Sequence, residues 1–566
     1  MSQPLLIETD TYVFWSHGER GGWMHLLPKR GGLRLLCVDP RGAVAWALAR
    51  DGDAVTLVES EPAWPAADSP ILSTVANVHR VQLDALIEQS RAGDFKPFDG
   101  LVIQDLSGRC IGTAGLPELE RLLAHAAALL SPAGWIYLGA ANRHSLLRWR
   151  HRLRPGQTSD HPVPSRARLT RLLKQAGMSE VRQHPYLLEQ EQVVEVLGPH
   201  GYRATKNVER LVERVKQRLF GRWGAPRLSP AFGLLGRRAA SPVSAMDELV
   251  QRLGLLRAPA GAVVTPPVLK HYLVFAGHKV IATIGPGNRN DYDVVAVLTG
   301  DAVSTRGRTL EAPHLKTLAA LPQVAARVPR PLDRFEFNGC QCFVLDHIPG
   351  VTLDRVVPLL STVTWRAMTF LIDLHLETAR PMEMAHAGRA ALIEPLLDAA
   401  SKRNPQWADA FGQWLAPLSA AFASHTLPAV FQHGDFKIEN VIYTPGSGAL
   451  RGVIDWEHAR NPGVPVLDLM YLLVYNRIIR GSHWTTAINS SIALGQWTPE
   501  EQECLRHYMS ALGIPESLML PLSALFLAHH VGCRIHLSPN SPWDAPLAAM
   551  IEQLSTQLRG QEPDPA

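Results

Sequence analysis

The 566-residue sequence has few cysteines, no long apolar run and little net charge, and each shortage excludes a class of protein. Its six cysteines show no zinc-binding spacing, and such sparse thiols are typical of a reducing compartment. No apolar run approaches the roughly 20 residues of a membrane-spanning helix, and the amino terminus lacks the basic and apolar regions of a signal peptide. The net charge of +4 is too small to imply nucleic-acid binding by itself. We therefore expect a soluble, cytoplasmic protein that does not bind nucleic acid.

The sequence is nevertheless rich enough in apolar residues to build more than one core. Hydrophobic residues make up 46% of the chain and charged residues 19%, which is typical of globular proteins. Its length suffices for several domains of about 100–200 residues each. No internal repeat and no Ser-His-Asp triad in a recognisable context occurs, so the function has to be inferred from other motifs.

A group of polar residues between positions 430 and 471 has the spacing that phosphoryl transfer requires. Asp435 follows an apolar run, Asn440 lies five residues later, and Asp455 ends a short predicted strand. Phosphoryl transfer needs a carboxylate that accepts the proton of the attacking hydroxyl, together with oxygen ligands for Mg²⁺. Lys437 lies between Asp435 and Asn440, where an ammonium can reach the γ-phosphate of a nucleotide as a point charge.

These residues stand in the runs HGDFKIEN (433–440) and IDWE (454–457). The two runs resemble the paired signature of the aminoglycoside phosphotransferase and choline kinase-like family. The resemblance implies an α+β, two-lobed protein kinase-like fold that uses ATP or GTP. It implies Asp435 as the catalytic base, assisted by Lys437, and Asn440 and Asp455 as Mg²⁺ ligands. Asp468 matches an acid that braces the catalytic loop in that family.

Three β-rich runs precede this signature and are separated by turn residues, which predicts an antiparallel sheet. The runs cover residues 268–275, 279–284 and 292–298. By resemblance, this sheet is the small lobe of the kinase-like fold. The predicted helix 309–321 carries Glu311, placed like the family's helix acid, and residues 342–350 resemble the strand between the lobes.

One residue that the family usually has is missing. A lysine on the third strand normally holds the α- and β-phosphates, and Ala296 stands at that place. We expect Lys279, at the start of the second strand, to take over this role with Glu311 orienting it, and Arg289 is the second choice. Without such a substitute the kinase-like part is a pseudokinase.

The amino-terminal part predicts an α/β Rossmann-like domain. Buried-strand and helical patterns alternate, as in βαβ units. The strands are expected at residues 33–38, 54–58, 98–105, 135–138 and 231–236, with helices at 43–50, 116–130 and 165–176.

This order resembles a class I S-adenosylmethionine-dependent methyltransferase over roughly residues 10–238. The resemblance implies that Gly42 and Glu59 bind the cofactor. However, Val38 and Pro40 stand where the family has glycines that let the backbone approach the cofactor. Binding of S-adenosylmethionine is therefore doubtful, and a degenerate methyltransferase fold is an open alternative.

Two basic segments lie next to this part of the chain. Five arginines fall within residues 143–154, and a predicted helix at 206–220 carries five lysines and arginines. Such surfaces can contact anionic lipids or phosphorylated glycans, although solvated helix faces have the same composition.

We predict a methyltransferase-like domain (1–238), a linker (239–261) and a kinase-like phosphotransferase (262–566), with lobes at 262–350 and 351–566. The predicted activity is transfer of the γ-phosphoryl group of ATP or GTP to a hydroxyl of a small molecule or glycan. Two alternatives stay open. One is a nucleotide-binding regulator or scaffold in which both parts have lost their chemistry, and the other is an active methyltransferase regulated by its kinase-like partner.

Overall fold

The computed structural model divides into two compact units, each described here by itself. Unit 1 comprises residues 1–305 and 332–347, and unit 2 comprises residues 306–331 and 348–566. The structure describes residues 22–560 except 29–31, 40–41, 51–52, 62–71, 73–74, 93–95, 106–110, 112–114, 143–163, 190–191, 198–228, 230, 258–266, 276–278, 287–293, 301, 353–358, 404 and 534–543.

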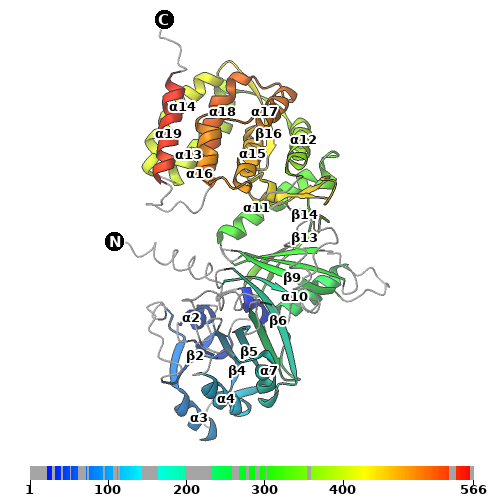
Figure 1. Cartoon of the computed structure of the whole chain (residues 1–566), viewed down its shortest axis with the longest axis vertical. Helices are drawn as coiled ribbons and strands as arrows, with labels where there is room; N and C mark the ends of the chain where they lie inside the picture. Colours follow the sequence, from blue (N-terminus) through cyan, green and yellow to red (C-terminus); the bar gives the residue numbers. More distant parts are fainter. Residues whose placement is uncertain are drawn as a thin grey trace. The chain divides into compact units, whose positions relative to one another are not determined.

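Unit 1 is built on one sheet of 13 strands in the order β12-β13-β11-β10-β9-β7-β6-β8-β5-β4-β1-β2-β3 (Figure 1). The strands are β1 (Arg34–Val38), β2 (Ala54–Glu59), β3 (Val78–Gln82), β4 (Phe98–Asp105), β5 (Leu130–Ala141), β6 (Glu180–Glu189), β7 (Gln192–Leu197), β8 (Ala231–Arg237), β9 (Pro267–Phe275), β10 (Lys279–Pro286), β11 (Val294–Thr299), β12 (Pro331–Phe337) and β13 (Cys340–Asp346).

Half of this sheet is a doubly wound α/β fold. Strands β3, β2, β1, β4 and β5 are parallel, and β8 runs antiparallel between β5 and β6. Helix α2 (Ala43–Arg50) contributes to the apolar cluster on one face. Helices α3 (Leu83–Ala92), α4 (Leu116–Ala124) and α7 (Arg166–Gln175) contribute to the cluster on the other. The predicted Rossmann-like fold is confirmed.

The other half of the sheet is antiparallel and contains the three strands predicted as the small lobe. Strand β10 pairs antiparallel with β9 and β11, as the turn-separated runs predicted, and β11 also pairs with β13. Strand β7 pairs with β9, with Leu197 opposite His271, and no motif in the sequence predicted this pairing. Main-chain hydrogen bonds therefore join the kinase-like strands to the methyltransferase-like sheet.

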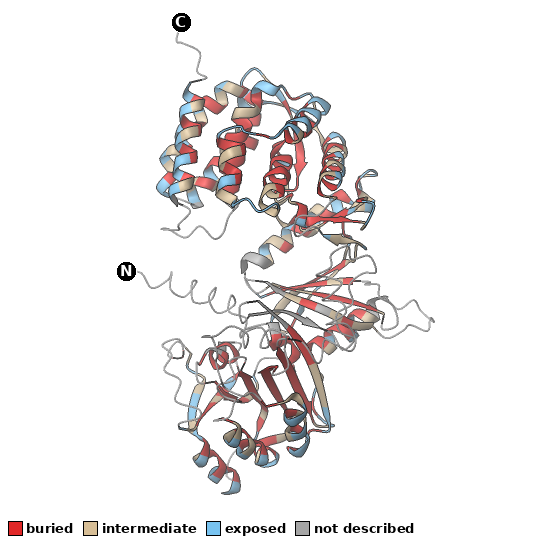
Figure 2. Ribbon diagram, in the orientation of Figure 1, coloured by how far each residue is buried: buried red, intermediate tan, exposed pale blue. Residues whose placement is uncertain are grey.

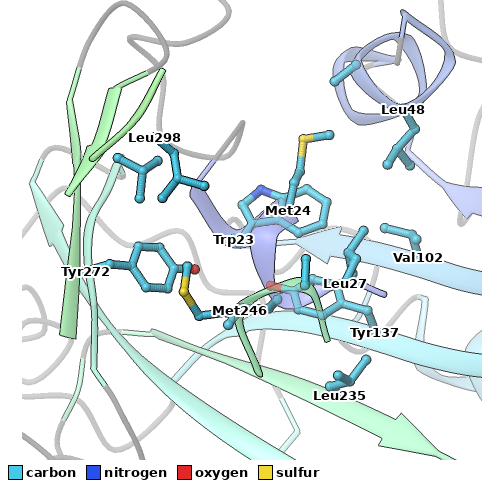
Figure 3. Packing of buried hydrophobic residues seen from close by; sticks show 14 of the residues in the cluster. Trp23, Met24, Leu27, Leu48, Val102, Tyr137, Leu235, Met246, Tyr272 and Leu298 are labelled. Carbon is cyan, nitrogen blue, oxygen red and sulfur yellow. The ribbon is translucent and has the colours of Figure 1, made fainter. Parts of the chain in front are cut away.

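The segment predicted as a linker belongs to the core of unit 1. It contains helix α10 (Ala245–Arg257), whose Met246, Leu249 and Leu253 are buried in the same cluster as Trp23. Figure 3 shows Met246 near Trp23 and Tyr137, whose rings stack with centroids 4.8 Å apart. The contacts thus divide the chain differently from the predicted boundaries at residues 238, 261 and 350, which stay predictions.

Unit 2 is mainly helical, and its central helices are buried (Figure 2). Its two small sheets have the orders β14-β17-β18 and β15-β16-β19. Its α-helices include α12 (Leu360–Thr378), α13 (Glu394–Arg403), α14 (Ala408–Phe422), α15 (Leu467–Ile479), α16 (Trp484–Ile488), α17 (Pro499–Ala511), α18 (Met519–Cys533) and α19 (Asp544–Arg559). The small strands are β14 (Val351–Thr352), β15 (Arg380–Glu383), β16 (Thr426–Gln432), β17 (Val441–Tyr443), β18 (Leu450–Val453) and β19 (Arg460–Gly463).

Among the described residues, no single helix has the length and apolar character to cross a membrane. The pair formed by residues 499–511 and 516–532 has the required length and composition together, but it is bent by 117°.

Candidate active site

The backbone of the loop after β16 is held by Asp468, at the start of α15. The Asp468 carboxylate accepts hydrogen bonds from the backbone N–H groups of His433 (2.6 Å) and Gly434 (2.9 Å). Burial raises the pKa of Asp468 to about 6, although the two N–H groups act in the opposite direction. The bracing role predicted for Asp468 is confirmed.

A glycine is required at position 434 because another segment of the chain approaches it closely. Its φ is +84°, and a Cβ atom would lie 2.2 Å from the carbonyl oxygen of His458. The Nε2–H of His529 donates to the Gly434 carbonyl at 2.9 Å, and burial lowers the pKa of His529 to about 4. A neutral imidazole therefore holds the loop, with its tautomer set by this hydrogen bond.

The carboxylate of Asp435 is the centre of a small polar group. Its Oδ2 lies 2.8 Å from Nζ of Lys437 and 3.3 Å from Nδ2 of Asn440. Nδ2 of Asn440 also donates to the Asp435 carbonyl at 2.9 Å, so the amide oxygen is the Asn440 atom that can bind a cation. Burial lowers the pKa of Lys437, but the charge of Asp435 outweighs it and the net shift is upward. The structure thus brings together three of the four residues predicted for catalysis and metal binding.

Asp455, the fourth of these residues, is brought to Asn440 by the β17–β18 hairpin. Val441 pairs with Val453, and the N–H of Ile454 donates to the Asn440 carbonyl at 3.0 Å. Asp455 has a left-handed backbone with φ of +71°. The donor set of one amide and one carboxylate consists of the hard oxygens that Mg²⁺ prefers, so these residues fit the ion.

Sequence reasoning missed Arg308, on helix α11 (Ala302–Leu318). Its guanidinium forms ion pairs with Glu311 and Asp455, and its Nε lies 3.4 Å from Oε2 of Glu457. The Arg308 side chain is only 4% exposed. Burial lowers the pKa of Arg308, but the surrounding carboxylates outweigh this and raise it. The i,i+3 spacing to Glu311 was the signal in the sequence, but such pairs are usually solvated.

Glu311 contacts an arginine of its own helix, where the sequence suggested a strand lysine. Its second oxygen accepts the backbone N–H of Trp456 at 3.0 Å. Ala296 is fully buried in an apolar cluster with Ala282 and Val344. Lys279 pairs with Thr299, and strand alternation puts its side chain on the face opposite to Ala296. The role predicted for Lys279 stays a prediction, and Arg289 lies outside the described residues.

The predicted cofactor residues of unit 1 lie at the carboxyl ends of β1 and β2, but the surrounding polar groups are satisfied by the chain itself. Gly42 has φ of +73° and donates to the Asp39 carbonyl at 3.0 Å. Oδ2 of Asp39 accepts from the N–H groups of Val44 (2.6 Å) and Ala45 (3.1 Å) at the start of α2.

Glu59, the second predicted cofactor residue, has partners of its own as well. It pairs with Arg80 at 3.5 Å and accepts from Gln82 at 3.3 Å. Its predicted role stays a prediction, as does that of Gly42. The basic segments 143–154 and 206–220 lie outside the described residues.

Comparison with known proteins assigns the carboxy-terminal part of the chain to a class. Residues 287–499 match the model of the phosphotransferase enzyme family APH. This part of the chain therefore carries a domain of that family, which confirms the resemblance drawn from its motifs.

A curated relative is the chicken (Gallus gallus) acyl-CoA dehydrogenase family member 11, 25% identical over 232 residues. That match covers 36% of this chain and 27% of the relative, so the chain spans about a quarter of the relative's length.

Solved structures match both parts of the chain. An aminoglycoside phosphotransferase of Streptomyces rimosus, in complex with ADP and streptomycin, is 17% identical with a TM-score of 0.32 and covers 51% of this chain and 99% of its own. An S-adenosylmethionine-dependent methyltransferase of Archaeoglobus fulgidus is 15% identical with a TM-score of 0.25 and covers 41% and 94%.

Proposed function

We propose that the protein transfers the γ-phosphoryl group of ATP or GTP to a hydroxyl group of a small molecule or glycan. The observation that carries this proposal is the polar group around Asp435, with Lys437 at 2.8 Å and Asn440 at 3.3 Å. The loop is held by Asp468 and His529, so these side chains are fixed before any ligand binds.

In the proposed reaction Asp435 accepts the proton of the acceptor hydroxyl while its oxygen attacks the γ-phosphorus. A new phosphorus–oxygen bond forms, the bond from the γ-phosphorus to the bridging oxygen breaks, and ADP or GDP leaves. Lys437 offsets the negative charge of the transferring group. Asn440 and Asp455 would hold Mg²⁺, which neutralises phosphate charge when it is bound.

The cytoplasm is the proposed location. Cys342 and Cys504 are free thiols, and burial raises the pKa of each to about 12. Reduced, unreactive cysteines of this kind are typical of a reducing compartment.

A second candidate function is nucleotide binding without catalysis. The specific observation in its favour is the apolar surrounding of Ala296, which excludes a phosphate-binding lysine from that position. In this case the protein would act as a nucleotide-dependent regulator or scaffold.

Calorimetry with ATP and GTP, with and without Mg²⁺, tests the proposal. We expect binding that requires Mg²⁺ in the parent and is lost in Asp455→Ala, together with release of ADP or GDP when an acceptor is supplied. Binding without phosphoryl transfer to any sugar or aminoglycoside hydroxyl would favour the regulator. If millimolar concentrations of neither nucleotide bind, both functions are excluded.

A further inference from the structure

The side chain of Arg308, on α11, is buried among carboxylates. Three carboxylates, from Glu311, Asp455 and Glu457, converge on its single guanidinium. One of them is the acid that the family resemblance assigns to Mg²⁺. Another is the helix acid that would normally contact the strand lysine.

We propose that Arg308 supplies the positive charge at the nucleotide phosphates that the sequence lacks at Ala296. The inference rests on the proposed function and names a binding residue for it. It replaces Lys279 as the first choice for this role.

The environment of Ala296 does not suit a charged side chain. The Ala296 side chain is completely buried and lies in the cluster that includes Ala282, Leu298 and Val344. A lysine there would bury its ammonium among apolar groups with no carboxylate beside it, which is costly. Arg308 meets the opposite condition, because each acid around it favours the charged form.

The hydrogen bonds of Glu311 hold Arg308 beside the candidate metal ligand. One Glu311 oxygen accepts from Arg308, and the other accepts the N–H of Trp456 at 3.0 Å. Trp456 directly follows Asp455, so helix α11 and this loop are tied together through one carboxylate. The guanidinium is therefore held in place and loses little freedom when a ligand arrives.

The guanidinium of Arg308 has more N–H donors than its hydrogen bonds to the carboxylates use. Nη1 donates to Glu311 and Nη2 donates to Asp455, and each nitrogen carries a second N–H. Nε has no hydrogen-bond partner in the described part of the protein, because its contact with Glu457 is an ion pair at 3.4 Å. The planar fork matches the oxygens of a phosphate group.

The same contacts permit an opposite role, in which Arg308 holds Asp455 and competes with the metal. The two roles predict opposite changes in affinity when Arg308 is removed. Phosphate binding predicts weaker Mg²⁺–nucleotide binding, whereas competition predicts tighter binding.

The experiment compares ligands that share a base and differ in phosphates. Calorimetry with Mg²⁺ measures ATP, ADP and adenosine, or GTP, GDP and guanosine if the parent prefers guanine. In Arg308→Ala we expect the nucleotides to bind about 10- to 100-fold more weakly, and the nucleoside to bind within about twofold of the parent. Arg306→Ala, which removes an exposed arginine from the same helix, is the matched control and should change neither.

The outcomes of this experiment distinguish phosphate binding by Arg308 from a purely structural role. An equal loss for nucleoside and nucleotides would show a purely structural role, and unchanged or tighter nucleotide binding would exclude the phosphate role. A parent that binds no nucleotide would overturn the proposed function as well. If Arg308→Ala does not fold by circular dichroism, Arg308→Lys carries the test. It keeps the charge without the fork and should weaken nucleotide binding by about tenfold with the nucleoside unchanged.

Discussion

Two loops of the molecule contain similar residues and use them differently. The loop after β1 in unit 1 and the loop after β16 in unit 2 each combine an acid with a glycine of positive φ, Gly42 and Gly434. In unit 1, Asp39 caps the helix that follows it. In unit 2, Asp435 is held by Lys437 and Asn440.

The difference lies in which residues hold the loop in shape. In unit 1, Asp39 lies three residues before Gly42, and its carboxylate is already bound to two N–H groups at the start of α2, where an anionic ligand would otherwise bind. In unit 2 the loop backbone is held by Asp468 and His529, so the carboxylate of Asp435 is not required for this.

The largest expected effect comes from removing the carboxylate of Asp435. We expect Asp435→Ala to lower the rate of phosphoryl transfer by about 10²- to 10⁴-fold, because a positioned base is lost. Nucleotide affinity, measured by calorimetry, should stay nearly unchanged. The control is Asp398→Ala, which removes an exposed acid that pairs with Lys402. A rate within about threefold of the parent would exclude Asp435 as the base.

The two glycines should respond unequally to alanine. Gly434→Ala adds a Cβ at 2.2 Å from a carbonyl oxygen as well as left-handed strain, so unfolding free energy should fall by more than about 3 kcal/mol. Gly42→Ala adds left-handed strain, for which we expect a loss of about 1–2 kcal/mol. Denaturant unfolding of both variants checks the order, and equal losses would contradict the comparison.

The acid beneath the catalytic loop should make stability depend on pH. The folded-state pKa of Asp468 is about 6, above the ordinary value of 3.8, so its contribution is complete below pH about 4 and is lost as the pH rises through 6. We expect the stability difference between parent and Asp468→Asn to shrink by about 2 kcal/mol from pH 4 to pH 6.5.

The stability difference between parent and Asp468→Asn is measured because the neighbouring histidines change stability with pH in the opposite direction. Burial lowers the pKa of His375 to about 3 and of His529 to about 4, and their contributions are lost as the pH falls. Both histidines are present in parent and variant, so they largely cancel. A difference that grows with pH would mean that the two backbone N–H groups keep Asp468 ionised.

The smallest expected effect is in unit 1. Since Asp39 occupies the start of α2 and Glu59 already contacts Arg80 and Gln82, we expect weak or no binding of S-adenosylmethionine. Calorimetry at millimolar cofactor should show no saturable heat. If S-adenosylmethionine binds in the low micromolar range and Glu59→Ala weakens that binding, then the loop after β1 accepts a ligand, as we propose for the loop after β16.

The order of elements and the catalytic motif were predictable because both depend on residues close together in sequence. The runs around Asp435 and Asp455 carry their own turns, and the hairpin between them is local. Arg308 was not predictable, because its pairing with Asp455 joins residues 147 positions apart. The pairing of β7 with β9 was not predictable for the same reason. The residue pattern of a strand shows which side chains are buried but not which other strand pairs with it.

That strand pairing makes the two modules hard to separate. A phosphotransferase cut out at residue 262 would keep β9 hydrogen-bonded to β10 but would remove β7 from its other side. The cut would leave residues 271–273 of β9 without their partners on β7, and an unpaired strand edge of this type can recruit other chains and aggregate. We therefore expect the methyltransferase-like half to keep this edge of the kinase-like strands from self-association, which requires no cofactor.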